Sequence, residues 1–358
     1  MKDGKRCILL LSDSFVGYGA EHILRWLGNK LCENGHKVVF CSIFDSDKPQ
    51  GLSEGAHNYQ MRFEWWKYDV HYFVKGARFL KRICKSENVD YVITFHTNPF
   101  LLALIARLFS SFKILHSERD NPYARDTMAT KIKMWLYRYA DKVVFQTEGA
   151  KQFFDKKTQR KSTIIPNPVE IPEFQWLNLS SAKTLVSVGR LDVRFKRQDL
   201  LLDAFSIINK EYPCYRLRFY GDGINRKQLE EKAVVLGISE KVDFLGKVSG
   251  VKEHLKNEGV FVMTSDSEGM PNSLMEAMAL GMPVISTDCE PGGARALIDD
   301  GVDGYITERS SVEDLVRVLR IVLADEKLQE SIGREARRKM LRFTPEQVFP
   351  IWINYIDQ

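Results

Sequence analysis

Short apolar runs and longer helical patterns alternate along the chain. In the first half, apolar runs lie at residues 7–11, 38–43, 91–95, 113–116 and 142–146. Apolar residues at helical spacing lie between them, for example at residues 22–33, 101–109 and 131–139. Short apolar runs are typical of buried strands, and strands that alternate with helices are typical of βαβ units around a parallel sheet. The first half is therefore predicted to be an α/β domain.

A proline cluster separates this series from a second one. Pro166, Pro168 and Pro172 resist both helix and strand, so they mark a domain boundary. Further apolar runs lie at residues 184–188, 216–220, 241–245, 260–264 and 284–287. Helical patterns between them include residues 198–209, 226–236 and 273–280. The pattern predicts two doubly wound α/β domains, residues 1–168 and 175–340, for which 358 residues suffice. We expect a ligand site in a cleft between them, at the carboxyl ends of the strands.

The chain ends in a helical apolar stripe. Its members within residues 345–358 are Val348, Phe349, Ile351, Trp352, Tyr355 and Ile356. Such a stripe needs an apolar surface to cover it. We therefore expect this C-terminal helix to pack back on the first domain.

The most informative segment joins the run at 260–264 to the helix at 273–280. It reads Ser267-Glu268-Gly269-Met270-Pro271-Asn272-Ser273, and a second acid, Glu276, follows in the first turns of the helix. Backbone N–H groups at the start of a helix have no intrahelical partner and favour a phosphate. A carboxylate beside such a site can accept hydrogen bonds from sugar hydroxyls. Alone, the two acids fit a solvated loop and a helix surface as well.

With its flanking residues, this segment resembles the Glu-x7-Glu signature of the retaining nucleotide-sugar glycosyltransferases of family 4. The resemblance implies the GT-B fold, in which two Rossmann-like domains face each other. It also implies that Glu268 contacts the donor sugar and that Glu276 binds the ribose. The backbone between them, at Gly269, Met270, Asn272 and Ser273, would hold the diphosphate.

A second segment agrees with the first. Gly189-Arg190-Leu191 follows the strand at 184–188, and Lys196 comes next before a helix. Two cations in such a loop can neutralise a diphosphate and stabilise it as a leaving group. The same family has Gly-Arg-Leu followed by Lys here, which implies that Arg190 and Lys196 contact the donor diphosphate. Simple solvation of both cations is the alternative.

Other glycine-bearing segments resemble family elements more loosely. Gly246-Lys247-Val248 resembles a segment near the nucleobase, and plain turns at 246 and at 220–223 are the alternative. Gly17-Tyr18-Gly19-Ala20-Glu21 resembles the Gly-Gly-Ala-Glu loop that faces donor phosphates and acceptor, although its glycines are not adjacent. The full Gly-x-Gly-x-x-Gly fingerprint is absent, which disfavours an NAD-binding domain.

Polar residues follow two strands of the first domain. Ser117-Glu118-Arg119 comes after the run at 113–116, where many family members have Ser-Glu-His with the histidine near the reacting sugar. With arginine at this position, the segment resembles that of the transferases of lipid-linked and polysaccharide assembly. Arginine cannot act as a base, so we expect Arg119, with Glu118, to hold a phosphate or sugar hydroxyl. His96, after the run at 91–95, is a further candidate contact to sugar or acceptor, with a structural role as its alternative.

The composition is that of a folded globular chain, and its net charge of +5 hides an asymmetry. Residues 1–170 carry 27 Lys and Arg against 18 Asp and Glu, a net charge of +9. Residues 171–358 carry 25 Lys and Arg against 29 Asp and Glu, a net charge of −4. Part of the surplus lies in residues 59–85, with eight aromatic residues and seven Lys or Arg against two acids. This mixture is typical of contact with an anionic membrane surface, and a core helix with solvated cations is the alternative. A nucleic-acid partner is disfavoured because no recognisable nucleic-acid module is present.

Signals for cofactors and compartment are few. The six cysteines form no Cys-x-x-Cys motif, so neither a disulfide framework nor a zinc site is expected. The donor segments contain no Asp-x-Asp motif. Because Arg190 and Lys196 can replace a divalent ion, we expect transfer without metal or cofactor. The apolar run at 7–11 is too short for a signal peptide or a membrane span. We expect a cytoplasmic protein, peripheral on the inner face of the cell membrane.

These expectations describe a retaining glycosyltransferase. It would move a hexose or N-acetylhexosamine from a UDP-sugar to a glycan acceptor linked to a polyprenyl diphosphate, in cell-surface polysaccharide or oligosaccharide assembly. The first domain would bind the acceptor and the second the nucleotide-sugar. Two alternatives stay open: a subunit that binds a nucleotide-sugar or glycan without turning it over, and a GT-B-type UDP-sugar epimerase.

Overall fold

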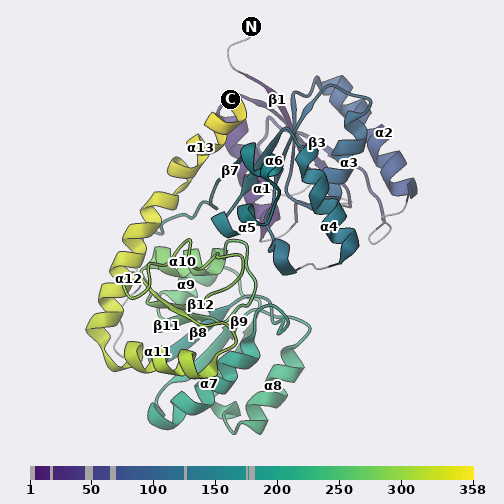
Figure 1. The fold of residues 1–358 in the computed structure, drawn as a ribbon. Helices are drawn as coiled ribbons and strands as arrows, with labels where there is room; N and C mark the ends of the chain where they lie inside the picture. Colours follow the sequence, from purple (N-terminus) through teal and green to yellow (C-terminus); the bar gives the residue numbers. More distant parts are fainter. Residues whose placement is uncertain are drawn as a thin grey trace. The chain divides into compact units, whose positions relative to one another are not determined.

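A computed structural model describes residues 5–16, 19–44, 51–64, 70–124, 127–174, 176 and 182–358 (Figure 1). The chain divides into two compact units. Unit 1 comprises Met1–Pro166 and Phe349–Gln358, and unit 2 comprises Asn167–Val348. Each unit has its own parallel sheet and its own hydrophobic core.

Unit 1 contains a seven-stranded parallel sheet in the order β3-β2-β1-β4-β5-β6-β7. Its strands are β1 (Cys7–Ser12), β2 (Lys37–Ser42), β3 (His57–Gln60), β4 (Tyr91–Thr94), β5 (Lys113–Ser117), β6 (Lys142–Phe145) and β7 (Ser162–Ile164). Its α-helices are α1 (Ala20–Glu33), α2 (Val70–Glu87), α3 (Thr97–Arg107), α4 (Met128–Trp135), α5 (Glu148–Gln152) and α6 (Lys156–Arg160). Two 3₁₀ turns, η1 (Pro122–Ala124) and η2 (Leu136–Tyr139), complete the unit.

The central strands of unit 1 are covered on both faces, which explains their continuous apolar runs. Leu9 and Leu11 belong to the core that includes α2 and α3 residues, whereas Leu10 lies against Gly28 of α1. The C-terminal helix α13 (Pro345–Asp357) supplies Trp352, which is fully buried and stacks on Phe95 with ring centroids 6.1 Å apart. The apolar stripe at the C-terminus thus packs on unit 1, as the sequence predicts.

Unit 2 contains a six-stranded parallel sheet in the order β10-β9-β8-β11-β12-β13. Its strands are β8 (Thr184–Val188), β9 (Arg216–Tyr220), β10 (Val242–Gly246), β11 (Val260–Met263), β12 (Val284–Thr287) and β13 (Tyr305–Thr307). Its helices are α7 (Gln198–Glu211), α8 (Arg226–Val235), α9 (Val251–Leu255), α10 (Asn272–Leu280), α11 (Val312–Ala324) and α12 (Glu326–Met340), with 3₁₀ turns η3 (Ser239–Lys241) and η4 (Leu341–Phe343).

Both sheets reverse their winding near the middle. In unit 1, β1 lies between β2 and β4, and in unit 2, β8 lies between β9 and β11. At such a switch point the loops after the two central strands diverge and leave a crevice. The loops after β1, β4, β8 and β11 carry Asp13, His96, Arg190 and Glu268 respectively. The topology of each unit therefore gathers its own candidate residues at one edge of its sheet.

Candidate active site

The loop between β11 and α10 in unit 2 is tied to its neighbours by hydrogen bonds. The Thr264 hydroxyl donates to the carbonyl oxygens of Lys196 (3.0 Å) and Arg197 (2.8 Å). The Glu268 N–H donates to the carbonyl oxygen of Glu290 at 2.8 Å. The segment that carries Lys196 and the loop that carries Glu268 are thereby held together.

Lys196 and Glu268 form the centre of the candidate site in unit 2. Lys196 Nζ lies 2.5 Å from Glu268 Oε1, and the Ser265 hydroxyl donates to the same oxygen at 2.7 Å. The two side chains are only 26% and 13% exposed. Within the described part of the chain, Glu268 Oε2 accepts no hydrogen bond. A carboxylate oxygen in this state can accept a hydrogen bond from a sugar hydroxyl.

The helix α10 begins beside this pair without a side-chain cap. Its first N–H groups have no partner inside the helix, and the helix dipole adds positive potential at this end. The Asn272 side chain is turned toward Asn167, whose Nδ2 donates to Asn272 Oδ1 at 2.6 Å and reaches the Met270 carbonyl at 3.4 Å. The backbone from Gly269 to Ser273 is therefore the part of this segment suited to an anion.

Glu276 lies one turn into α10 and is half-buried. Burial raises the pKa of its carboxyl; Lys252 opposes this rise and Glu170 adds to it. Among the described residues, Glu276 has no hydrogen bond or ion pair. Burial of a polar group without a hydrogen bond costs free energy, which the hydroxyl groups of a ligand would recover.

The segment after β8 approaches the segment after β9 very closely. The Gly189 N–H donates to the Tyr220 carbonyl at 2.9 Å, and a Cβ on Gly221 would lie 1.9 Å from the Gly189 carbonyl oxygen. Gly221 also has φ of +137°, so both the close contact and the backbone conformation exclude a side chain at this position. The Arg190 guanidinium lies 3.7 Å from Asp192 and is 66% exposed, which leaves it able to reach a ligand.

Gly246, Lys247 and Val248 follow β10 at the edge of the sheet. The Gly221 N–H donates to the Gly246 carbonyl at 2.8 Å, so the backbone of Gly246 joins the same cluster of loops. Val248 packs against the core and Lys247 is exposed. These residues thus lie at the β9–β10 end of the crevice, away from the β11–α10 loop along the sheet order.

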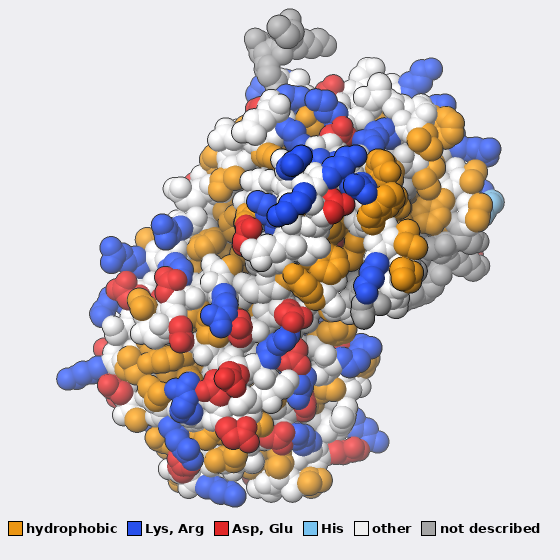
Figure 2. Space-filling model, viewed as in Figure 1, with side chains coloured by type: hydrophobic (Ala, Val, Ile, Leu, Met, Phe, Trp, Pro, Cys, Tyr) orange, Lys and Arg blue, Asp and Glu red, His pale blue; other side chains and the backbone are white. Residues whose placement is uncertain are grey.

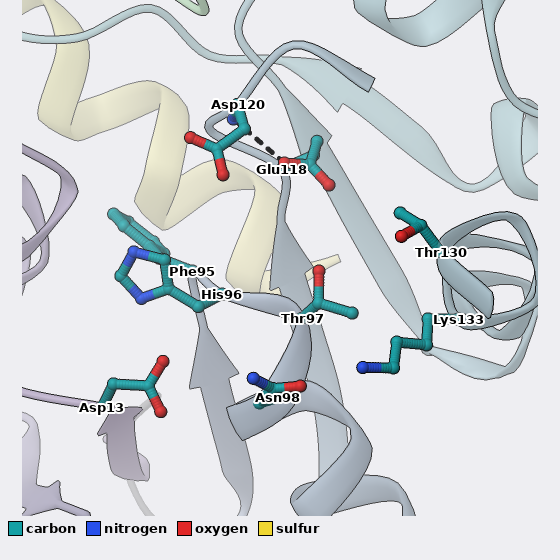
Figure 3. Close-up of a pocket in the computed structure, with 9 residues that line it drawn as sticks. All are labelled: Asp13, Phe95, His96, Thr97, Asn98, Glu118, Asp120, Thr130 and Lys133. Carbon is teal, nitrogen blue, oxygen red and sulfur yellow. Dashed lines mark hydrogen bonds between the residues drawn. The ribbon is translucent and has the colours of Figure 1, made fainter. Parts of the chain in front are cut away.

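Unit 1 holds a pocket of about 200 Å³ at the carboxyl ends of its strands (Figure 3). The lining residues are Asp13, Phe95, His96, Thr97, Asn98, Glu118, Asp120, Thr130 and Lys133. Three of them are carboxylates, and Lys133 points from α4 toward Thr97 and Asn98. Because acids and neutral polar groups predominate, the pocket suits hydroxyl and amide groups of a sugar better than a phosphate.

Glu118 is held by several donors. Its Oε1 accepts from the N–H groups of Arg119 and Asp120, both at 3.0 Å, and its Oε2 accepts from the Tyr137 hydroxyl at 2.9 Å. The Thr97 hydroxyl lies 2.7 Å from the same Tyr137 oxygen. These hydrogen bonds fix the Glu118 side chain within its loop, and its expected contact with a phosphate or sugar hydroxyl stays a prediction.

Arg119 does not line the pocket. Its guanidinium lies 4.1 Å from the ring centroid of Phe95 and 5.5 Å from that of Trp352, and the residue is 8% exposed. Burial lowers the pKa of the guanidinium, which Glu118 opposes. Arg119 is thus a buried cation stacked on aromatic rings, and the expected contact with a sugar or phosphate would require it to leave them.

His96 does line the pocket, at the residue before α3. Its Nε2 lies 3.8 Å from a carboxylate oxygen of Glu21 in the first turn of α1. Its Nδ1 is buried and has no hydrogen-bond partner among the described residues. An unsatisfied buried ring nitrogen is costly. His116 shares this feature, but His96 alone of the two lines the pocket and is thus the better placed to meet a ligand hydroxyl.

The glycine loop before α1 is described only in part. Gly17, one of the candidate donor contacts, lies outside the described residues, as does Tyr18. Gly19 occupies the N-cap position of α1 without a side-chain cap. The contact between this loop region and the pocket is made by Glu21, through His96.

Residues 59–85 divide into a core part and an exposed part. Residues 65–69 lie outside the described residues; the other aromatic side chains pack on the core beneath α2, and Tyr72 is 2% exposed. A groove of about 820 Å³ is lined by Met61, Arg62, Phe63, Lys75, Arg78, Phe79, Lys81 and Arg82. None of its five cations forms an ion pair within the described chain. The core-helix alternative thus holds for the described aromatics, and the cations line an anion-attracting groove.

Three residues that support the sites were not predicted. Asn167 comes from the proline cluster, Tyr137 from η2, and Gly293 from the turn after β12. A Cβ on Gly293 would lie 2.6 Å from the Gly269 carbonyl oxygen. The Gly292-Gly293 doublet was the one available signal, because the contacts of Asn167 and Tyr137 depend on tertiary structure.

The described ranges contain no cluster of metal-ligating side chains and no membrane-spanning helix. Among these residues, no three His, Cys, Asp or Glu side chains come together as a metal site, and the six cysteines are free. No described helix combines the length and apolarity needed to cross a bilayer.

The chain is similar to known sequence families over most of its length. Residues 18–172 match the family described as Glycosyltransferase Family 4, and residues 171–339 match Glycosyl transferases group 1. An uncharacterized glycosyltransferase of Haemophilus influenzae is 24% identical over 340 residues, which cover 93% of this chain and 95% of that protein. A Campylobacter jejuni protein is 25% identical over 349 residues, 95% of each chain. Its name is GalNAc-alpha-(1->4)-GalNAc-alpha-(1->3)-diNAcBac-PP-undecaprenol alpha-1,4-N-acetyl-D-galactosaminyltransferase.

Solved structures agree on the fold. Sucrose-phosphate synthase from Thermosynechococcus elongatus superposes with a TM-score of 0.84 at 18% identity, covering 98% of both chains. Anabaena HepE in complex with UDP and glucose superposes with a TM-score of 0.83 at 17% identity, covering 99% of this chain and 100% of that one. The chain therefore belongs to the GT-B glycosyltransferases, with an N-terminal family 4 domain and a C-terminal group 1 domain.

Proposed function

We propose that the chain is a retaining glycosyltransferase that moves a hexose or N-acetylhexosamine from a UDP-sugar to a polyprenyl-diphosphate-linked glycan. The observation that carries this proposal is the Lys196–Glu268 pair beside the uncapped start of α10. A cation from the loop after β8, with backbone N–H groups and a free carboxylate oxygen from the loop after β11, matches the diphosphate and hydroxyl groups of a nucleotide-sugar.

Each donor group has a proposed partner in unit 2. Lys196, Arg190 and the N–H groups from Gly269 to Ser273 bind the diphosphate, Glu268 Oε2 binds a sugar hydroxyl, and Glu276 binds the ribose. As the bond from the anomeric carbon to the diphosphate oxygen breaks, the sugar gains oxocarbenium character and the diphosphate gains negative charge. Fixed cations and N–H groups stabilise that charge. Anabaena HepE, a fold neighbour, has been solved with UDP-glucose, which supports a UDP-sugar donor.

The same groups make a divalent ion unnecessary. A metal in such a reaction neutralises the leaving diphosphate. Arg190 and Lys196, both in the loop after β8, carry positive charges that can do the same. We therefore propose transfer without metal or other cofactor. Activity that EDTA abolishes and Mg²⁺ restores would contradict this part.

Unit 1 is the proposed acceptor side. Its pocket offers carboxylates, His96 and amide groups to acceptor hydroxyls. The name of the Campylobacter relative includes an undecaprenol-diphosphate-linked glycan, which supports a lipid-linked acceptor. The cation groove of segment 59–85 supports contact with the anionic surface where such an acceptor resides. We propose that this sugar transfer belongs to cell-surface glycan assembly and takes place at the cytoplasmic face of the membrane.

The test follows UDP release from a panel of UDP-sugars with membrane-extracted lipid-linked acceptors. We expect release only when the correct sugar and an acceptor are both present, and a product that keeps the anomeric configuration of the donor. Glu268→Gln should lower the rate by about 100- to 1000-fold. Glu231→Gln, on the exposed side of α8, is the matched control and should behave as the wild type.

Two outcomes would point to the alternatives. A chain that binds UDP and transfers no sugar from the panel would be a binding subunit. Interconversion of UDP-sugars without acceptor would indicate an epimerase.

A further inference from the structure

One helix face of unit 1 is apolar and uncovered. It comprises Met128, Ile132 and Trp135 of α4 and Tyr139 of η2, which are 72%, 55%, 48% and 43% exposed, and we call it the α4 face. The spacing puts the first three on one side of the helix. The rings of Trp135 and Tyr139 meet edge to face, with centroids 5.7 Å apart.

The α4 face is not the face that the fold uses. Met134 and Tyr137, on the other side of the same segment, are buried in the unit 1 core. The segment therefore has two apolar sides, and one of them is left to solvent. Neighbouring large apolar side chains on an exposed surface commonly mark an interaction site.

Cations border the α4 face. The Arg138 guanidinium lies 4.9 Å from the Trp135 ring centroid, and Lys157 Nζ lies 5.5 Å from that of Tyr139. Figure 2 shows hydrophobic side chains over α4 beside Lys and Arg side chains over α6. The exposed cations of α6 that form no ion pair within the described chain are Lys156, Lys157 and Arg160. Residues 127–161 carry nine Lys or Arg against three Asp or Glu, a net charge of +6.

We propose that the α4 face is the surface by which unit 1 lies on an anionic lipid bilayer. The rings of Trp135 and Tyr139 sit at the depth of the headgroups, the Ile132 and Met128 side chains reach the acyl boundary, and the α6 cations meet lipid phosphates. The positive charge favours this partner, because an apolar stripe beside the α6 cations, which form no ion pair within the described chain, needs a partner that is both apolar and anionic. Two copies of the chain would bring two such positive surfaces together, which disfavours self-association.

This inference does not depend on the proposed donor or acceptor chemistry. The α4 face also differs from segment 59–85, whose described aromatic side chains are buried in the core or packed against it. Vesicle binding and sugar transfer can therefore fail independently of each other.

The test is co-sedimentation of the full chain with vesicles. We expect binding to vesicles of phosphatidylglycerol and phosphatidylcholine, weak binding to phosphatidylcholine alone, and a decrease with added salt. Combined Ile132→Ser, Trp135→Ser and Tyr139→Ser should lower partitioning about tenfold or more. Since these side chains are only part-exposed, a second variant, Lys156→Glu with Lys157→Glu, changes charge alone at the surface and should lower it about tenfold.

A matched control removes exposed apolar side chains elsewhere. Val234→Ser with Val235→Ser, in α8 of unit 2, alters residues that are 65% and 85% exposed and should leave vesicle binding unchanged. The proposal is overturned if the wild-type chain ignores phosphatidylglycerol vesicles, or if both α4 and α6 variants bind them like the wild type. Self-association that the α4 substitutions abolish, without vesicle binding, would instead assign the face to a second copy.

Discussion

Units 1 and 2 share an architecture and differ in the charge of the groups they offer at the switch point. In unit 2, Lys196, the exposed Arg190 and the first N–H groups of α10 favour an anion. In unit 1, the pocket is lined by three carboxylates, and Lys133 is the one Lys or Arg among its lining residues. The sheet topology places both sites, whereas the loops after the strands set which charge each will accept.

The net charge of each half of the chain does not match the charge of the groups in its candidate site. The half with −4 holds the loop suited to a diphosphate, and the half with +9 holds the carboxylate-lined pocket. The surplus of unit 1 lies instead on exposed surfaces around α2, α4 and α6. The net charge of each half thus indicates which partners its exposed surface attracts. A few local groups determine which ligand the site at the strand ends binds.

The largest effect is expected from closing the space beneath the donor loop. In Gly293→Ala, the new Cβ would meet the Gly269 carbonyl oxygen at 2.6 Å and displace the loop that carries Glu268. UDP affinity, measured by calorimetry, should fall by about a hundredfold or more. Its neighbour Gly292 has open space around a Cβ and φ of +92°, so Gly292→Ala should cost about 1–2 kcal/mol of stability and keep the affinity. Equal losses in both variants would contradict this role of the close approach.

The pH dependence of UDP binding tests the role of Glu276 in unit 2. Loss of its hydrogen bonds to the ribose in Glu276→Gln should weaken UDP binding about tenfold. Burial raises the pKa of this carboxyl, and binding needs the ionised form. Affinity should therefore decline as pH falls, starting at a higher pH than for an ordinary glutamate. This decline should vanish in Glu276→Gln; its persistence there would assign it to another group.

Tyr137 tests whether unit 1 contributes through positioning. Tyr137→Phe removes the hydroxyl that donates to Glu118 Oε2 and lies 2.7 Å from the Thr97 hydroxyl. We expect sugar transfer to fall about threefold to tenfold, at a stability cost of about 1–2 kcal/mol, while UDP affinity is unchanged. A variant with lower UDP affinity and normal transfer at saturating donor would reverse the assignment of the two units.

The smallest effect at neutral pH is expected from His116. Burial, with His96 and Arg119 adding to it, lowers the pKa of His116 to about 3, so this histidine is neutral in the folded chain. The unfolded chain takes up the proton near pH 6.5. Its contribution to stability is therefore complete above that pH and is lost as pH falls toward 3, by about 1.4 kcal/mol per unit. Urea unfolding of His116→Gln should show a weaker loss in this range; an identical pH profile would be inconsistent with a buried neutral imidazole.

The strands with continuous apolar runs were predictable, whereas three of the four edge strands, β3, β7 and β13, were not. β1 is buried along its whole length, so most of its side chains are apolar and the strand can be seen in the sequence. β3, with the sequence His-Asn-Tyr-Gln, pairs with β2 through its backbone while its side chains are half-buried or exposed, so no apolar pattern marks it. β7, at the other edge of the same sheet, and β13, at one edge of the unit 2 sheet, are strands of three residues each. Backbone pairing at an edge leaves little trace in the side chains.

The candidate site divides in the same way. Motif order was enough to select Glu268 and Lys196, but their 2.5 Å contact follows from the parallel pairing of β8 and β11. Glu118 and Arg119 were selected as ligand contacts, which stays a prediction. Their contacts with Tyr137 and Trp352, remote in sequence, follow from packing that no motif marks. The helix in segment 59–85 was visible as a pattern; packing decided that Tyr72 faces the core.

The central claim is that unit 2 holds a nucleoside diphosphate with its own cations and N–H groups. Calorimetric titration of UDP into the full chain, with EDTA and then with Mg²⁺, tests it directly. We predict equal binding in both conditions, an affinity about tenfold or more lower for Lys196→Ala, and unchanged binding for the matched surface variant Lys227→Ala. Binding that requires Mg²⁺, or a Lys196→Ala chain that binds UDP as tightly as the wild type, would contradict the claim.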